Sequence, residues 1–122
     1  MLPLVVEPIG TVRRRADGSC VVKVREEFQE GLLGIAPGDR IQVLYWMHKL
    51  NPQARRRLQV HPRGDTSRPL AGVFSVRSPM RPNPIGVSNV QVQAVEGNEI
   101  VVAGLDALDG SPVLDIKGFP DR

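Results

Sequence analysis

The chain has 122 residues, a formal net charge of +3 at pH 7 and a single cysteine, Cys20. This length is enough for a domain with a core of its own, so we expect one domain over residues 1–122. One cysteine excludes an internal disulfide and a cysteine-built metal cluster, and the sequence carries no membrane-spanning apolar run and no signal-peptide pattern. These features predict a soluble cytoplasmic domain without a bound metal.

Short runs rich in valine and isoleucine are separated by glycine, proline, asparagine and aspartate, and no segment shows sustained helical periodicity. This pattern predicts an all-β, mainly antiparallel fold, either a small barrel or a sandwich. The strands expected in chain order are Val5–Arg13, Ser19–Val24, Arg40–Met47, Leu58–His61, Leu70–Val76, Ser88–Glu96, Glu99–Leu105 and Pro112–Ile116.

The segments between these strands carry turn chemistry. Residues 16–18 and 96–98 are expected to be hairpin turns, because glycine and asparagine tolerate positive φ. Residues 37–39 read as a turn that enters the next strand. Short helical turns are expected at Glu26–Leu33 and Pro52–Arg57.

Positive charge is concentrated in the middle of the chain. Residues 40–81 hold nine basic side chains and one acidic one, a local charge of +8, whereas residues 1–39 carry −1 and residues 82–122 carry −4. Such an excess suits contacts with phosphate groups, and its densest part is Arg55, Arg56 and Arg57. An arginine triplet is also compatible with a solvated surface loop.

The strongest signal is the segment 72–87, which contains Arg77, Arg81 and Asn83 together with three prolines. Proline fixes φ and removes a backbone donor, so we expect a stiff, extended loop that holds these polar side chains in place. A loop that only joined two strands would need two to five residues. The segment therefore predicts a binding site. No glycine-rich nucleotide-binding motif or nucleophile elbow occurs, so a nucleotide cofactor would be held without a Rossmann unit.

A second block, Leu105 to Lys117, reads Leu-Asp-Ala-Leu-Asp-Gly-Ser-Pro-Val-Leu-Asp-Ile-Lys. With the first block, it resembles the TsaA-like (TrmO-type) family of S-adenosylmethionine-dependent tRNA methyltransferases. That family carries Gly-Val-Phe-Ala-Thr-Arg-Ser-x-x-Arg-Pro-Asn-Pro-Ile-Gly and then Leu-Asp-x-x-Asp-Gly-Thr-Pro-Val-x-Asp-Ile-Lys-Pro-Tyr. A weaker likeness at residues 8–12, 45–48 and 58–65 extends the resemblance over nearly the whole chain.

The resemblance implies a single-sheet β-barrel that forms a homodimer and holds S-adenosylmethionine near the subunit boundary. The implied acceptor is the exocyclic nitrogen of a threonylcarbamoyl-modified adenosine next to the tRNA anticodon. The cofactor-binding residues that it implies are His48, Lys49, Arg77, Val87, Leu105, Asp106 and Ala107. Arg77 is expected to pair with a carboxylate of the ligand.

Methyl transfer to this acceptor requires a base, because the lone pair of its nitrogen is delocalised until the proton is removed. Asp106 and Asp115 are the candidates. The arginine-rich middle is expected to follow the phosphates of the tRNA. The residues expected to contact the tRNA are Arg55, Arg56, Arg57, Arg81, Asn83 and Lys117.

Alternatives remain at several of these positions. His48 could be a satisfied structural histidine, and the aspartates at 106, 109 and 115 could be turn residues. Gly10, Gly72 and Gly86 are interpreted as structural, allowing close backbone approach or positive φ. Where the family carries a Pro-Arg-Gln element, this chain has only the short turn at residues 14–19. The arginine triplet Arg13, Arg14 and Arg15, which precedes residues 16–18, is interpreted as a polar hairpin end. The alternative functions are a non-catalytic barrel that binds RNA or a small nucleotide, and a methyltransferase with a different acceptor.

Overall fold

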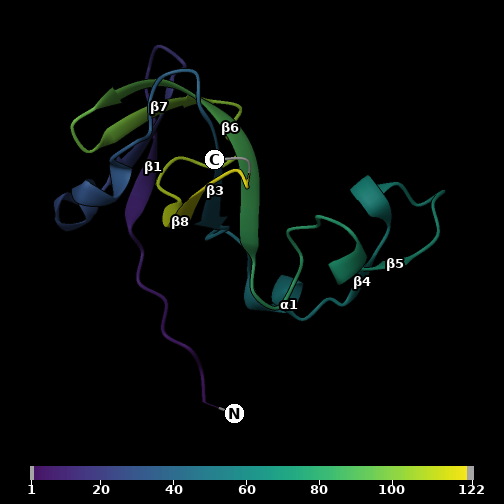
Figure 1. Ribbon diagram of the computed structural model, residues 1–122. Helices are drawn as coiled ribbons and strands as arrows, with labels where there is room; N and C mark the ends of the chain where they lie inside the picture. The colour runs from purple at the N-terminus through teal and green to yellow at the C-terminus, as the bar shows by residue number, and fades with distance from the viewer. Residues whose placement is uncertain (1, 121–122) are drawn as a thin grey trace.

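The computed structural model describes residues 2–120 and consists mainly of one closed β-barrel (Figure 1). Its six strands follow the order β1-β2-β7-β6-β3-β8, and each paired neighbour is antiparallel. The strands are β1 (Gly10–Arg14), β2 (Cys20–Val24), β3 (Arg40–Trp46), β6 (Ile85–Glu96), β7 (Glu99–Ala103) and β8 (Pro112–Gly118). The predicted all-β, mainly antiparallel barrel is confirmed.

The barrel interior is filled by alternating side chains. In β6, Ser88, Val90 and Val92 are buried, whereas the residues between them are exposed. This two-residue period is expected for a strand with one face toward the core. The core is almost entirely aliphatic, and its most deeply buried members include Val12, Val22, Val24, Ile41, Val43, Ile100 and Val113.

Between β3 and β6 the chain leaves the barrel and forms an excursion, residues 47–84, beside one end of it (Figure 1). The excursion contains β4 (Gln59–Val60) and β5 (Ala71–Gly72), which pair with each other as a separate two-stranded sheet. It also contains α1 (Pro52–Arg55) and the short 3-10 helices η2 (Pro62–Gly64) and η3 (Val73–Ser75), whereas η1 (Glu26–Leu32) follows β2. The excursion carries every basic residue of the arginine-rich middle except Arg40.

The structure corrects three strand boundaries. Pairing of the first strand begins at Gly10 and not at Val5, and the expected strand Leu70–Val76 is two residues long because η3 follows directly. β6 begins at Ile85 and not at Ser88, because pairing with β3 starts immediately after the last proline of the loop. No helix in the described part of the chain is long and apolar enough to cross a membrane.

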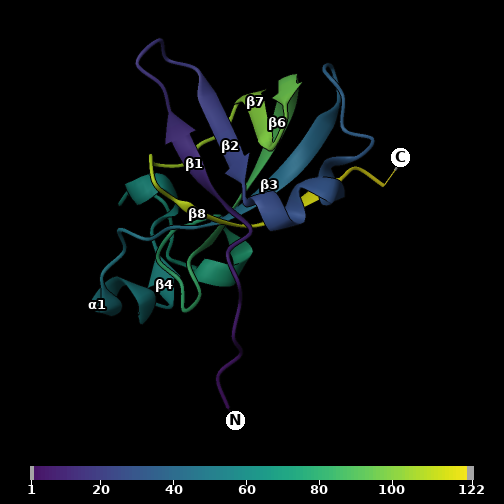
Figure 2. The ribbon, with the colours of Figure 1, turned by 90° about the vertical axis from the view of Figure 1, so that its left-hand side faces the viewer.

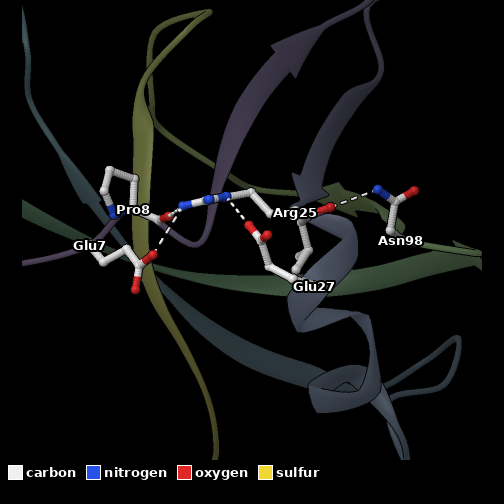
Figure 3. A network of polar contacts seen from close by, with 6 residues as sticks. Glu7, Pro8, Arg25, Glu27 and Asn98 are labelled. Carbon is white, nitrogen blue, oxygen red and sulfur yellow. Dashed lines mark hydrogen bonds and ion pairs between the residues drawn. The ribbon is translucent and has the colours of Figure 1, made fainter.

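An arginine fixes the segment that precedes β1 (Figure 3). Nη1 of Arg25 lies 3.3 Å from a carboxylate oxygen of Glu7 and 3.3 Å from the carbonyl oxygen of Pro8, and its Nε pairs with Glu27. The backbone N–H of Arg25 also donates to the carbonyl of Ile9 at 2.8 Å. Beyond these contacts, the chain extends away from the barrel toward the N-terminus (Figure 1 and Figure 2).

Two of the three glycines interpreted as structural allow a close approach. A Cβ at Gly10 would lie 2.3 Å from the carbonyl oxygen of Lys23, and a Cβ at Gly86 would lie 2.4 Å from Cζ of Tyr45. The interpretation is wrong for Gly72, where a Cβ would meet only the Leu58 carbonyl oxygen, at 4.0 Å. The close approach at Gly86 leaves room for the Tyr45 ring to lie against the β6 backbone.

Candidate functional site

The site is built on the loop that joins β7 to β8, and two barrel side chains hold three consecutive carbonyl groups of this loop. Arg14 donates from Nη2 to the carbonyl of Leu105 and from Nε to the carbonyl of Ala107, the latter at 2.9 Å. The hydroxyl of Tyr45 donates to the carbonyl of Asp106 between them. The loop shape is therefore set by side chains of β1 and β3.

The Tyr45 side chain reaches the loop from the end of β3. The register of β3 against β8 shifts at Tyr45, and such a bulge re-aims the side chain beside it. The ring rests on the bare backbone of Gly86 in β6. The buried hydroxyl of Ser88 lies 3.4 Å from the Tyr45 hydroxyl and accepts a hydrogen bond from the N–H of Asp106 at 3.3 Å. The strands β3 and β6, which lie between β7 and β8 in the barrel, thus both contribute to holding Asp106.

These contacts decide what the loop offers a ligand. The side chains of Leu105 and Ala107 turn into the core, with 4% and 6% exposure, whereas the Asp106 side chain is exposed. The three carbonyls are occupied, and the N–H of Ala107 makes no hydrogen bond within residues 2–120. The loop therefore offers a ligand the carboxylate of Asp106 and the backbone N–H of Ala107.

Two cavities meet at Asp106. The first, which we call the barrel-end cavity, has a volume of about 360 Å³ and is lined by Arg14, Tyr45, Met47, Lys49, Leu50, Pro79, Asp106, Ala107, Leu108 and Ser111. The second, which we call the arginine cavity, has a volume of about 980 Å³ and lies against the excursion. Asp106 and Pro79 line both, and both volumes fall within the range of small-molecule sites, roughly 300–1,000 Å³.

The arginine cavity is lined by cations. Its charged and polar wall includes Arg57, His61, Arg63, Arg68, Arg77 and Asp106. Arg68 pairs with Asp65 at 3.7 Å, whereas the other three arginines make no ion pair in the described part of the chain. The cavity can therefore neutralise an anionic group of a ligand.

Residues 61–68, which supply His61, Arg63 and Arg68 to this cavity, are ordered by contacts among themselves. Nδ1 of His61 lies 2.7 Å from the carbonyl oxygen of Arg68. The Ser67 hydroxyl and backbone N–H donate to Asp65 and lower the pKa of that carboxyl. Arg63 has a φ of 56°, a left-handed conformation that non-glycine residues rarely adopt. Backbone strain of this kind clusters at functional sites.

Two arginines hydrogen-bond to backbone carbonyls of the proline-containing loop, and a third faces the arginine cavity. Arg81 is half-buried and donates to the carbonyl of Ser78 at 2.9 Å within the same loop. Arg55 donates from Nε to the carbonyl of Pro82 at 2.9 Å and lies over the Trp46 ring, 5.2 Å from its centroid. Both arginines therefore brace the loop, whereas Arg77 is exposed on the cavity wall.

The structure brings only some of the predicted site residues together. Lys49, Asp106 and Ala107 line the barrel-end cavity, and Arg57, Arg77 and Asp106 line the arginine cavity. Leu105 lines neither cavity, but its carbonyl accepts a hydrogen bond from Arg14, which lines the barrel-end cavity. The other predicted residues outside the two linings are His48, Arg55, Arg56, Arg81, Asn83, Val87, Asp115 and Lys117.

Three of these residues lie clearly elsewhere in the fold. Asp115 lines a separate cavity of about 490 Å³ between η1 and β8, and Lys117 is exposed two residues further along β8. Val87 is exposed on the outer face of β6. His48 is half-buried, and its Nδ1 lies 3.4 Å from the Ser111 hydroxyl. This contact is compatible with the alternative that His48 is a satisfied structural histidine.

The sequence analysis did not identify Arg14, Arg63 or Arg68 as site residues. Arg14 was expected to sit at a polar hairpin end, but it follows the buried residues Gly10 and Val12 at the same two-residue spacing. An arginine in phase with the core-facing positions of a strand is the signal that could have identified it. Arg63 and Arg68 gave no comparable signal, because only the tertiary fold brings them to the cavity.

The fold and site define a class of protein, a small closed barrel with a ligand site where a β–β loop meets a basic excursion. The chain belongs to the family of tRNA-methyltransferase O N-terminal domains, which matches residues 10–122. This confirms the resemblance to TrmO-type proteins.

Individual relatives agree with this assignment. The chain is 44% identical over 96% of its length to a "Probable S-adenosyl-L-methionine-binding protein" of Pyrococcus horikoshii, of which it covers 83%. It is 40% identical over 95% of its length to an "S-adenosyl-L-methionine-binding protein" of Archaeoglobus fulgidus, of which it covers 89%. A "tRNA (adenine(37)-N6)-methyltransferase" of Mus musculus is 34% identical over 91% of this chain, which covers 27% of that protein.

Solved structures show the same fold. The crystal structure of TrmO from Pseudomonas aeruginosa superposes with a TM-score of 0.72 over 97% of this chain, at 26% sequence identity. The chain spans only 56% of that structure.

Proposed function

We propose that this chain binds S-adenosylmethionine and transfers its methyl group to the exocyclic nitrogen of adenosine 37 of tRNA. The names of the archaeal relatives support the cofactor, and the name of the mouse relative supports the acceptor position. This substrate places the proposed activity in the cytoplasm. The finer proposal is that the acceptor adenosine already carries a threonylcarbamoyl group.

The barrel-end cavity fits the cofactor chemically. Its apolar side chains, among them Met47, Leu50 and Leu108, suit an adenine ring, and the unpaired N–H of Ala107 offers a donor to a ring nitrogen. Asp106 can accept from ribose hydroxyls or an amino group, and Lys49 can pair with the carboxylate of the methionine part. When bound, the sulfonium supplies an electrophilic methyl group, so the chain has only to position the two reactants and remove a proton.

The arginine cavity fits the acceptor. A threonylcarbamoyl group carries a carboxylate, and Arg57, Arg63 and Arg77 provide guanidinium groups that pair with no anion among residues 2–120. In this arrangement Arg77 pairs with the acceptor carboxylate or with that of the cofactor, since it stands on the wall near Asp106. The remaining exposed arginines, including Arg56, would contact the tRNA phosphates.

The observation that carries the proposal is the position of Asp106 on the border between the two cavities. A base that removes the proton of the acceptor nitrogen must lie beside both reactants. Of the two candidate bases, only Asp106 lies there, because Asp115 lines the cavity next to η1.

The test compares Asp106→Asn with Asp115→Asn as a matched control. Loss of a general base lowers the rate roughly 10²–10⁴-fold. We therefore expect Asp106→Asn to lose at least about a hundredfold in methyl transfer from labelled S-adenosylmethionine to tRNA, and Asp115→Asn to stay near the wild-type rate. Full activity of Asp106→Asn would contradict the assignment. Tight tRNA binding by a wild-type chain that binds no S-adenosylmethionine would instead support a non-catalytic RNA-binding barrel.

We also propose that the chain acts as a homodimer. Three large apolar side chains of the excursion are exposed to solvent: Phe74 by 75%, Leu58 by 58% and Leu70 by 58%. They flank the two-stranded β4–β5 sheet, where Leu58 accepts a backbone hydrogen bond from Val73. Exposed large apolar side chains are typical of interaction surfaces, so this sheet is the proposed contact with a second copy.

A further inference from the structure

We infer that Arg14 is a positioning residue of this site, and that its guanidinium holds the loop around Asp106 in the shape that ligand binding requires. The inference rests on the proposed function, because it assigns Arg14 a role toward the proposed cofactor. It goes beyond that function in naming a residue that acts through the loop backbone.

Arg14 connects two parts of the chain that are far apart in sequence. Its side chain bonds the carbonyls of Leu105 and Ala107, the two neighbours of Asp106, and its backbone N–H donates to Oδ1 of Asp109 at 2.8 Å. A guanidinium is planar and presents several N–H groups in a rigid fork. The two carbonyls are therefore fixed relative to each other, and Asp106 is fixed between them.

The other hydrogen bonds of the loop hold mainly its second half: the N–H of Gly110 donates to the carbonyl of Val12 at 2.8 Å, and the Ser111 hydroxyl donates to the carbonyl of Leu108 at 2.7 Å. Residues 104–111 lie outside the strands, so no sheet ladder orders them. Gly104 and Gly110 near its ends have φ values of 90° and 84°, in a region that glycine adopts freely. Within residues 2–120, the backbone of Asp106 itself is hydrogen-bonded by the hydroxyls of Tyr45 and Ser88. Loss of the guanidinium would leave the backbone on both sides of Asp106 without its partners.

The chain offers a matched control for the charge. Arg13 precedes Arg14 in β1, is exposed and makes no side-chain hydrogen bond or ion pair in the part of the chain that the structure describes. Arg13→Ala thus removes the same charge from the same strand without touching the loop. Arg14→Lys keeps the charge at the cavity wall, but its single nitrogen does not reproduce the fork that bonds both carbonyls.

Two measurements test the inference on Arg14→Ala, Arg14→Lys and Arg13→Ala: amide hydrogen exchange of residues 104–111 in the free chain, and calorimetric titration with S-adenosylmethionine. Hydrogen bonds from a charged donor are among the stronger ones, so their loss should change an equilibrium by about tenfold or more. We expect both Arg14 variants to exchange the hydrogen-bonded amide of Asp106 at least about tenfold faster and to bind the cofactor at least about tenfold more weakly. Arg13→Ala should match the wild type in both.

Several results would overturn the inference. Unchanged loop exchange in Arg14→Ala would show that the guanidinium does not hold the loop, whatever the affinity. Wild-type affinity in Arg14→Lys beside weak binding in Arg14→Ala would show a role of charge alone. If Arg14→Ala fails to fold, the lysine variant decides the question by the same two measurements. A wild-type chain that binds no cofactor would refute the proposed function, whereas the exchange data would still decide whether Arg14 holds the loop.

Discussion

At the scale of residues, the site depends on one close approach. The Tyr45 ring lies against Gly86, and its hydroxyl donates to the Asp106 carbonyl. Tyr45 can reach that carbonyl only because the β6 backbone has no side chain at this point. A glycine in a strand often marks such an approach, so its structural importance was predictable from sequence. The ring that it accommodates was not.

The variant Gly86→Ala tests this contact. Its Cβ would stand 2.4 Å from Cζ of Tyr45, so the ring must shift, and we expect this shift to disturb the hydrogen bond from its hydroxyl to Asp106. Overpacking of this kind typically costs about 1–3 kcal/mol. We expect a loss of that size in the free energy of urea unfolding, together with weaker binding of S-adenosylmethionine in calorimetry.

Gly72→Ala is the control for this prediction. Its Cβ would meet only the Leu58 carbonyl oxygen, at 4.0 Å, and the φ of Gly72 is −64°. It should unfold and bind as the wild type does. Equal behaviour of the two alanine variants would show that Tyr45 adapts without loss.

At the scale of elements, the strands and hairpins of the barrel were predictable because they depend on local patterns. Alternating apolar residues define β6, and the turns at residues 16–18 and 96–98 join neighbouring strands, as their glycine chemistry predicts. The excursion was less predictable. Whether Ala71 and Gly72 continue as a strand depends on partners that only the tertiary fold supplies, and β4 offers pairing for two residues.

The exposed sheet of the excursion yields a prediction for assembly. If β4–β5 forms the contact between two copies, a polar side chain at Phe74 will weaken it, because an apolar contact is replaced by a hydroxyl. We expect sedimentation analysis to find the wild type as a dimer and Phe74→Ser shifted toward the monomer. Leu33→Ser serves as the control, since Leu33 is 95% exposed at the end of η1 and should leave the dimer intact. A monomeric wild type would contradict the proposed contact.

At the scale of the whole molecule, the barrel serves as a frame for two chemically different cavities that meet at Asp106. One end supplies a mostly apolar pocket, and the excursion adds the cations of the arginine cavity. Both charged segments of the site, the arginine-rich middle and the acidic loop at residues 105–109, were visible in the sequence. The sequence could not reveal that Asp106 and Asp115 lie in separate cavities, because this separation follows from the path of the chain between the loop and β8.

The most direct measurement of the central claim is methyl transfer from labelled S-adenosylmethionine to two tRNA preparations, one with and one without the threonylcarbamoyl group on adenosine 37. Because the acceptor side is lined by three arginines without an ion pair in the described part of the chain, we expect label to enter only the modified tRNA, at its exocyclic nitrogen. Equal labelling of both preparations would contradict the role of the arginine cavity. No labelling of either, by a chain that binds the cofactor, would contradict the acceptor.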